Sequence, residues 1–191
     1  MSFIKGILTL IGLVVVIAMA ILGVKYGSSA MKMDSKALGL YMNMADKVLE
    51  TGDPAKGMVI RRKLIIEEGT TKEEAIENAK EVMDEIGEQY GLAVVDQKTM
   101  PSSFYIHIRS YCSPSIAEIF LKHSGEFIGF MPCRIGIVED PKTGEVWLYT
   151  MDLDMMISGG HTLPKELMEY AKEVKTGMMR MLEEGAKGEE N

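Results

Sequence analysis

The chain of 191 residues lacks the motifs that most often mark an active site. It contains no nucleophile elbow, glycine-rich phosphate loop, HExxH metal motif or CxxC pair. Asp152 and Asp154 come nearest to a metal motif, but a lone DxD is more typical of a solvated turn. These absences favour a non-enzymatic role, such as binding, over catalysis.

Positive charge is also scarce in the sequence. The 21 Lys and Arg residues are outnumbered by 28 Asp and Glu, which gives a formal net charge of −7 at pH 7. No basic cluster stands out along the chain. Because a protein that binds a polyanion needs a concentrated positive surface, we do not expect nucleic acid as a partner.

Cysteine is nearly absent, with only Cys112 and Cys133 in the chain. Two cysteines allow a disulfide, a shared soft-ligand site or two buried thiols. A disulfide is expected in an oxidising compartment and free thiols in a reducing one, so the location of the domain decides between these alternatives.

One long hydrophobic run is present near the N-terminus. Residues 7–24 contain no charge, are almost all Leu, Ile, Val, Ala or Gly, and are framed by Lys5 and Lys25. At about 1.5 Å per residue, a helix of this length is near the lower limit for crossing a bilayer. A cleaved signal peptide is the alternative, but its apolar core is usually shorter. We predict a single-pass membrane anchor over residues 1–27.

Two features of the sequence make opposite predictions about the side of the membrane on which the domain lies. A short tail before a single span predicts an extracytoplasmic domain, whereas Lys25, Lys32 and Lys36 after the span favour the cytoplasmic side under the positive-inside rule. We predict an extracytoplasmic domain, attached to the membrane through residues 7–24.

Residues 28–56 are predicted to form a juxtamembrane helix and a linker. Apolar residues recur at helical spacing over residues 35–51, and the turn residues 52–54 end the helix. The apolar stripe of this helix packs either on its own domain or on a neighbouring subunit.

Residues 57–191 are predicted to form an α+β domain with an acidic C-terminal tail. Thr71 and Glu74 form a capping box at the start of its clearest helix, and residues 140–144 form the turn of a β-hairpin. The predicted strands cover residues 58–66, 92–97, 104–111, 134–139 and 145–151. The predicted helices cover residues 71–91, 114–124 and 163–184.

Two of the strands alternate clearly between faces. In the strand of residues 104–111, one face carries Ile106 and Ile108, and the other carries two tyrosines, a histidine and an arginine. In the strand of residues 134–139, Ile135 and Ile137 share one face. The polar and aromatic face of the first strand holds the residues Tyr105, His107, Arg109 and Tyr111.

Four segments of the sequence resemble the family of small α+β proteins known as domain of unknown function 302, in particular its membrane-anchored branch. The segments are TGDPAKGMV, HIRSYCSP, FMPCRIGIVED and VWLYTMDLDMMISGGHTLPKEL. The resemblance extends over residues 38–188 and implies a curved antiparallel sheet with long packed helices, in a β-α-β(4)-α-like order, here preceded by one transmembrane helix. It implies no activity. Where relatives often have Lys or Pro after the double glycine, this chain has His161.

The candidate site combines sulfur and imidazole side chains. His107, Cys112 and Cys133 form its centre, and soft ligands of this kind suit copper, zinc or haem. Further binding candidates are Met131, Arg134, Trp147, Met155, Met156 and His161. The alternatives are that the methionines, 17 in all, fill the core, and that His107 is hydrogen-bonded to Tyr105 or to a backbone carbonyl. Arg134 either lowers the pKa of Cys133 or pairs with Glu139 or Asp140.

Three functions are consistent with these features. The first is an accessory or interaction subunit of a membrane assembly, for example a respiratory or redox assembly, with other membrane subunits or a second copy of the chain as partner. The second is a redox domain that binds haem or a soft metal such as copper through Cys, Met and His. The third is a thiol redox enzyme that uses Cys112 and Cys133.

Overall fold

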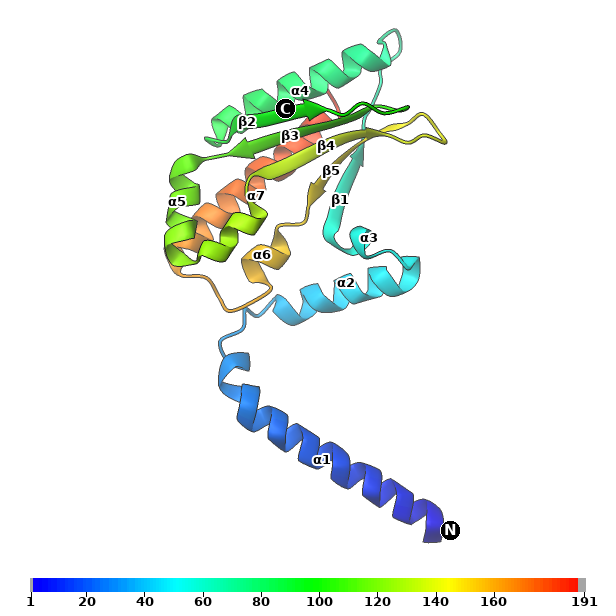
Figure 1. Ribbon diagram of the computed structural model, residues 1–191, viewed down its shortest axis with the longest axis vertical. Helices are drawn as coiled ribbons and strands as arrows, with labels where there is room; N and C mark the ends of the chain where they lie inside the picture. Colours follow the sequence, from blue (N-terminus) through cyan, green and yellow to red (C-terminus); the bar gives the residue numbers. More distant parts are fainter. Residues whose placement is uncertain (1, 189–191) are drawn as a thin grey trace.

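The computed structural model describes residues 2–188, which form a long N-terminal helix and an α+β domain (Figure 1). The N-terminal helix α1 (Ser2–Ala30) projects away from the domain. Between Ile4 and Ala30 it reaches a mean hydropathy of 3.0 in its most apolar stretch, and none of that stretch is buried. By length and composition, α1 is therefore able to cross a membrane.

A short linker, residues 31–36, joins α1 to the domain and is hydrogen-bonded to it. Met33 forms an isolated antiparallel β-bridge with His161. On either side of this bridge, the Asp34 amide donates to the Gly160 carbonyl at 2.9 Å and the Thr162 amide donates to the Lys32 carbonyl at 3.1 Å. The linker is thus attached to the loop that precedes the last helix.

The helix predicted over residues 35–51 is present as α2 (Ala37–Thr51), which ends at Gly52 in the left-handed conformation that glycine favours. The one-turn helix α3 (Pro54–Met58) follows, and the Asp53 carboxylate caps it by accepting from the Ala55 amide at 2.9 Å. Across the domain, the Tyr41 hydroxyl donates to the Gly159 carbonyl at 2.9 Å. These contacts hold one side of α2 against the domain.

The described residues form a five-stranded sheet in which all neighbouring strands are antiparallel, in the order β1-β5-β4-β3-β2. The strands are β1 (Val59–Lys63), β2 (Ala93–Thr99), β3 (Ile106–Cys112), β4 (Cys133–Glu139) and β5 (Val146–Met151). The predicted hairpin joins β4 and β5, with Gly144 at positive φ in its turn. The α+β prediction is confirmed.

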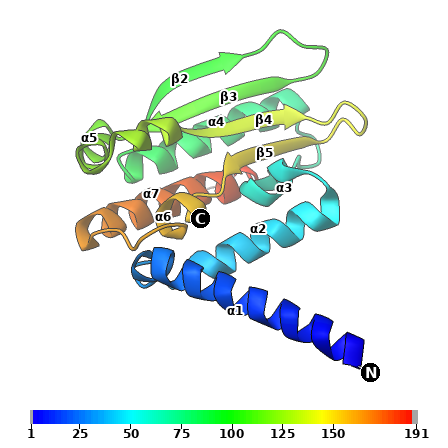
Figure 2. The ribbon, with the colours of Figure 1, turned by 60° about the horizontal axis from the view of Figure 1, so that its bottom comes forward.

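Two long helices, α4 (Lys72–Gln89) and α7 (Lys165–Gly185), cover the same face of this sheet (Figure 2). The capping box at the start of α4 is present, because the Thr71 amide donates to the Glu74 carboxylate at 2.8 Å and the Glu74 amide donates to the Thr71 hydroxyl at 3.2 Å. Side chains fill the space between helices and sheet. Fully buried among them are Ala79, Met83, Ile86, Tyr111, Ile135, Ile137, Leu148, Met181 and Leu182.

The polar and aromatic face of β3 is the one that points toward the helices. His107 and Tyr111 are buried, and Arg109 forms an ion pair with Asp84 of α4. The Tyr111 hydroxyl also donates to Asp84, at 3.0 Å. Because a buried charge needs a partner, Asp84 makes this inward orientation of Arg109 stable. The isoleucine face of β3, with Ile106 and Ile108, therefore points to the uncovered side of the sheet.

Three shorter helices lie at the ends of the strands. The helix α5 (Pro114–His123) matches its prediction, whereas the 3-10 helix η1 (Gly125–Phe130) and the one-turn helix α6 (Asp154–Ser158) were not predicted. In η1, the Phe127 ring packs edge-on against Phe120 of α5 with 5.1 Å between centroids. This contact holds η1 at one end of the sheet.

A test of the packing uses glycines in two helices. A Cβ atom at Gly87 of α4 would lie 2.7 Å from the Leu92 carbonyl oxygen, whereas one at Gly39 of α2 would meet nothing within 4 Å. We expect Gly87→Ala to lower the free energy of unfolding by about 1–3 kcal/mol through overpacking. Gly39→Ala should leave it unchanged or raise it by up to about 1 kcal/mol. Denaturant unfolding of the full-length protein in detergent measures both, and equal effects would contradict this packing.

Candidate functional site

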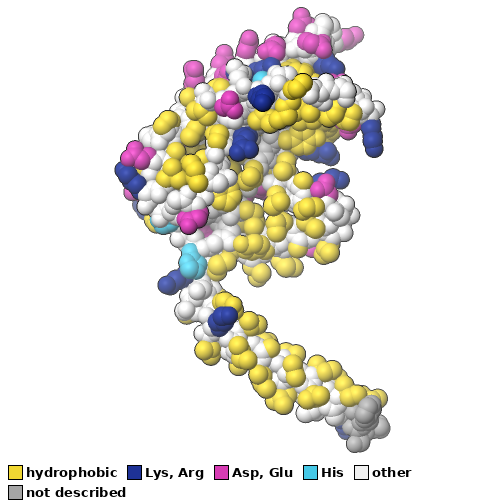
Figure 3. Space-filling model, viewed as in Figure 1, with side chains coloured by type: hydrophobic (Ala, Val, Ile, Leu, Met, Phe, Trp, Pro, Cys, Tyr) yellow, Lys and Arg dark blue, Asp and Glu magenta, His cyan; other side chains and the backbone are white. Residues whose placement is uncertain are grey.

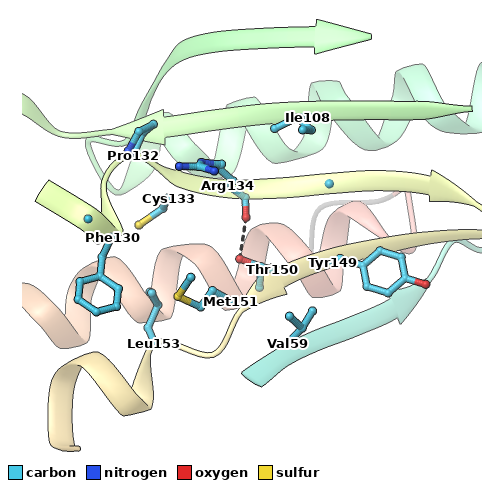
Figure 4. Close-up of a pocket in the computed structure, with 12 residues that line it drawn as sticks. Val59, Ile108, Phe130, Pro132, Cys133, Arg134, Tyr149, Thr150, Met151 and Leu153 are labelled. Carbon is cyan, nitrogen blue, oxygen red and sulfur yellow. Dashed lines mark hydrogen bonds between the residues drawn. The ribbon is translucent and has the colours of Figure 1, made fainter. Parts of the chain in front are cut away.

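A cavity of the domain opens on the uncovered face of the sheet, opposite α4 and α7. Its volume is about 360 Å³. It lies over β3, β4 and β5, with η1 at one end (Figure 4). The residues that line it are Val59, Ile108, Gly129, Phe130, Pro132, Cys133, Arg134, Gly136, Tyr149, Thr150, Met151 and Leu153. Most of these side chains are apolar, as in many ligand and partner sites.

Strand register and a glycine together create the hollow. Ile108, Gly136 and Tyr149 are direct cross-strand partners on β3, β4 and β5, so they form one row across the sheet. A Cβ atom at Gly136 would approach no atom closer than 4.0 Å. The missing side chain therefore leaves a gap between Ile108 and Tyr149. Phe130, at the end of η1, lines the opposite end of the cavity from Tyr149, beside Leu153 (Figure 4).

Two guanidinium groups lie on the uncovered face of the sheet. The Arg134 side chain is exposed at the cavity, while its backbone carbonyl accepts a hydrogen bond from the Thr150 hydroxyl at 2.8 Å (Figure 4). Arg61 of β1 stacks over the Trp147 ring at 4.4 Å. Within residues 2–188, neither arginine forms an ion pair, so Glu139 and Asp140 are not partners of Arg134. Glu139 pairs with Lys72 instead, at 2.8 Å.

Cys112 and Cys133 lie at the adjoining ends of β3 and β4, and both are free thiols. Burial, together with the neighbouring Cys112, raises the pKa of Cys133 to about 11. Burial also raises the pKa of Cys112. Arg134 therefore does not lower the pKa of Cys133. Because the thiolate is the reactive form, protonated thiols at neutral pH disfavour the thiol redox enzyme.

His107 is buried on the helix-covered side of the sheet, away from the cavity. Its Nδ1 lies 2.8 Å from the hydroxyl of Thr99 on β2, and its Nε2 has no hydrogen-bond partner among the described residues. Burial is the main reason that the pKa of His107 is lowered, and the positive charges of Lys80 and Arg109 lower it further. The partner of the ring is thus Thr99, rather than the Tyr105 hydroxyl or the backbone carbonyl considered from the sequence.

The remaining candidate residues are dispersed. Met131 and Met156 pack against the core, Met155 is half-buried in α6, and His161 is exposed in the bridge to the linker. Among residues 2–188, no group of three or more His, Cys, Asp or Glu side chains could hold a metal ion. The structure therefore does not bring His107 together with Cys112 and Cys133 as one ligand set for a metal ion.

The family model named Domain of unknown function DUF302 matches residues 68–185, which is more than half of the chain. The chain belongs to the DUF302 family. The matched region runs from the turn before α4 to the end of α7 and includes β3, β4 and β5, which form the floor of the cavity. The helices α1 and α2 and the strand β1 precede the region matched to DUF302.

One solved structure with the same family name is similar to this chain. It is the crystal structure of an uncharacterized conserved protein DUF302 from Bacillus stearothermophilus, at 18% sequence identity and a TM-score of 0.47. The similarity covers 65% of this chain and 95% of that one. No curated protein matches the chain.

The sequence-based candidates overlap only in part with the cavity. Arg134 and Cys133 line it, and Trp147 lies on the same sheet face. Ile108, Tyr149 and the other apolar lining residues were not among the candidates. Gly136, in the alternating strand of residues 134–139, was the feature that could have indicated a hollow.

The raised pKa of Cys133 predicts a pH dependence of stability. The folded-state pKa of about 11 exceeds the ordinary value of 9.0, so the folded protein holds this proton more tightly than the unfolded chain does. The resulting stabilisation is fully present below pH 9.0 and is lost as pH rises through about 11. Denaturant unfolding of the full-length protein in detergent across this range measures the loss.

Cys133→Ala should reduce this alkaline loss of stability, whereas Cys112→Ala should retain most of it because Cys133 remains. Alkylation by iodoacetamide gives a second readout, since the rate at Cys133 should stay low at neutral pH and rise toward pH 11. Rapid alkylation of folded Cys133 at pH 7 would contradict the assignment.

Proposed function

We propose that this DUF302 protein is a membrane-anchored, non-enzymatic interaction subunit that binds a partner of a membrane assembly on the uncovered face of its sheet. The observation that carries the proposal is the apolar cavity beside Arg134, on the side of the sheet that α4 and α7 leave uncovered. The proposal assigns α1 the role of anchor, which its length and hydropathy support.

The residue types around the cavity support a protein partner. Aromatic residues, Met and Arg are enriched in the buried centres of protein interfaces and often contribute most of the binding energy. On this face they are Arg61, Phe130, Arg134, Trp147, Tyr149 and Met151. Phe130 and Met151 are exposed by 41% and 49%, so a partner could cover them.

The charge of the face indicates which chemistry the partner has. Arg134 and Arg61 form no ion pair within residues 2–188, although the chain as a whole carries a net charge of −7. A partner that contributes an apolar side chain to the cavity and a carboxylate beside Arg134 would satisfy both features.

The extracytoplasmic location of the domain stays a prediction, and the free thiols of Cys112 and Cys133 are the state expected in a reducing compartment.

A photo-crosslinking experiment tests the proposal in native membranes. Benzoylphenylalanine replaces Tyr149 at the cavity or, as a control, Glu169 on the exposed surface of α7, in the full-length chain. We expect an adduct of one defined mass from position 149 and none from position 169. The mass of the adduct identifies the partner as a second copy of the chain or as a different subunit.

Charge reversal then tests the role of Arg134. In the Tyr149 crosslinking protein, Arg134→Glu should reduce the adduct about tenfold or more, since it places a carboxylate opposite the acidic partner. Lys142→Glu makes the same change of charge in the exposed hairpin turn and should have no effect. Absence of the adduct from position 149, or an adduct that Arg134→Glu leaves unchanged, would refute the proposed interface.

A further inference from the structure

The helix α2 has a second apolar stripe that no part of the domain covers. Its first apolar side contacts the domain through Ala37, which is buried, and through Met44 and Val48, which pack around Gly57 of α3. Next to that side, residues 38, 42, 45 and 49 follow one another at helical spacing. The side chains of Leu38, Met42 and Leu49 are exposed by 75%, 55% and 82%.

The uncovered stripe lies at the end of the domain from which α1 departs. Only residues 31–36 separate the two helices, and the β-bridge between Met33 and His161 holds this linker against the domain. In Figure 3, hydrophobic side chains gather along this end of the domain and again along α1, with His and Lys side chains at the junction between them. Met31 in the linker is itself 85% exposed. The apolar surfaces of α1 and α2 are therefore separated only by this short linker, which contributes an exposed methionine.

Charged residues around the stripe are distributed as at a membrane surface. Lys25, Lys32 and Lys36 lie at the end of α1 and in the linker, where their ammonium groups can reach anionic headgroups. The polar residues of α2 lie on the other side of the helix from the stripe. They are Asn43, Asp46, Lys47 and Glu50, all exposed. A helix with this division of residues is typical of the bilayer interface.

We infer that α2 lies in the plane of the membrane surface, with Leu38, Met42 and Leu49 buried at the boundary between lipid headgroups and acyl chains. The inference rests on the proposed role of α1 as the anchor, because a membrane-spanning α1 brings α2 to the bilayer surface within a linker of residues 31–36. The lipid surface is the occupant that this short separation favours, since it covers α1 and the stripe together. The domain is then attached to the membrane at two helices.

Tryptophan fluorescence of the full-length chain in vesicles tests this placement. The vesicles contain phosphatidylcholine and phosphatidylglycerol, with or without bromine atoms on the acyl chains. Trp147, the only tryptophan, is first replaced by Phe. In that background, Leu49→Trp reports on the stripe, Asn43→Trp on the polar side of α2, and Leu13→Trp on the middle of α1.

The inference predicts quenching of Leu49→Trp by brominated lipid to less than about half of its fluorescence, because the apolar face of an interfacial helix is buried about 5–10 Å into the boundary between headgroups and acyl chains. Leu13→Trp should be quenched as well, and Asn43→Trp should not. Quenching of Leu13→Trp without Leu49→Trp would overturn the inference and leave the anchor intact. An unquenched Leu13→Trp would overturn the anchor and the inference together.

A blue-shifted but unquenched Leu49→Trp would mean that protein, not lipid, covers the stripe, and it would also overturn the inference. Equal quenching of Leu49→Trp and Asn43→Trp would do the same, because both sides of the helix would then be immersed. Leu13, Asn43 and Leu49 are exposed in the structure, and Trp147→Phe keeps an aromatic ring at a half-buried position, so each variant is expected to fold.

Discussion

The packing of α4 and α7 on the same face of one sheet determines the rest of the structure. The two helices enclose the buried apolar side chains of β4 and β5, including Ile135, Ile137 and Leu148, and supply the domain with its core. An antiparallel sheet can leave its other face uncovered, and here that face carries the cavity and both unpaired arginines among the described residues. The core and the proposed partner site thus occupy opposite sides of the same strands.

Much of this fold could be predicted from local sequence patterns. The capping box at Thr71, the alternation in β4 and β5 and the turn at Gly144 each depend on neighbouring residues, and each is present in the structure. The helices α3, η1 and α6 are too short to show a helical period. The alternation of residue types along β3 distinguishes its two faces but does not indicate which face points toward the helices. The orientation of β3 depends on Asp84, a residue of α4 that lies far from β3 in the sequence.

The candidate site was predictable only where it depended on sequence neighbours. Arg134 lies at the cavity, within the segment that the sequence identified. The proposed soft-ligand site depended on distant residues meeting in space, and strand geometry keeps His107 apart from the two cysteines. His107 precedes Cys112 by five positions on β3, about 16 Å at the rise of a strand. A coordinate bond to a shared ion spans only about 2 Å.

The β-bridge between Met33 and His161 also affects how a partner is encountered. A domain on a flexible tether samples many orientations, and few of them present a given face to another protein in the bilayer. Here the linker is hydrogen-bonded to the loop before α7, so rotation of α1 about its axis turns the whole domain with it. A chain anchored by α1 diffuses in the two dimensions of the bilayer, and its binding face keeps a fixed orientation relative to α1 when it meets a partner.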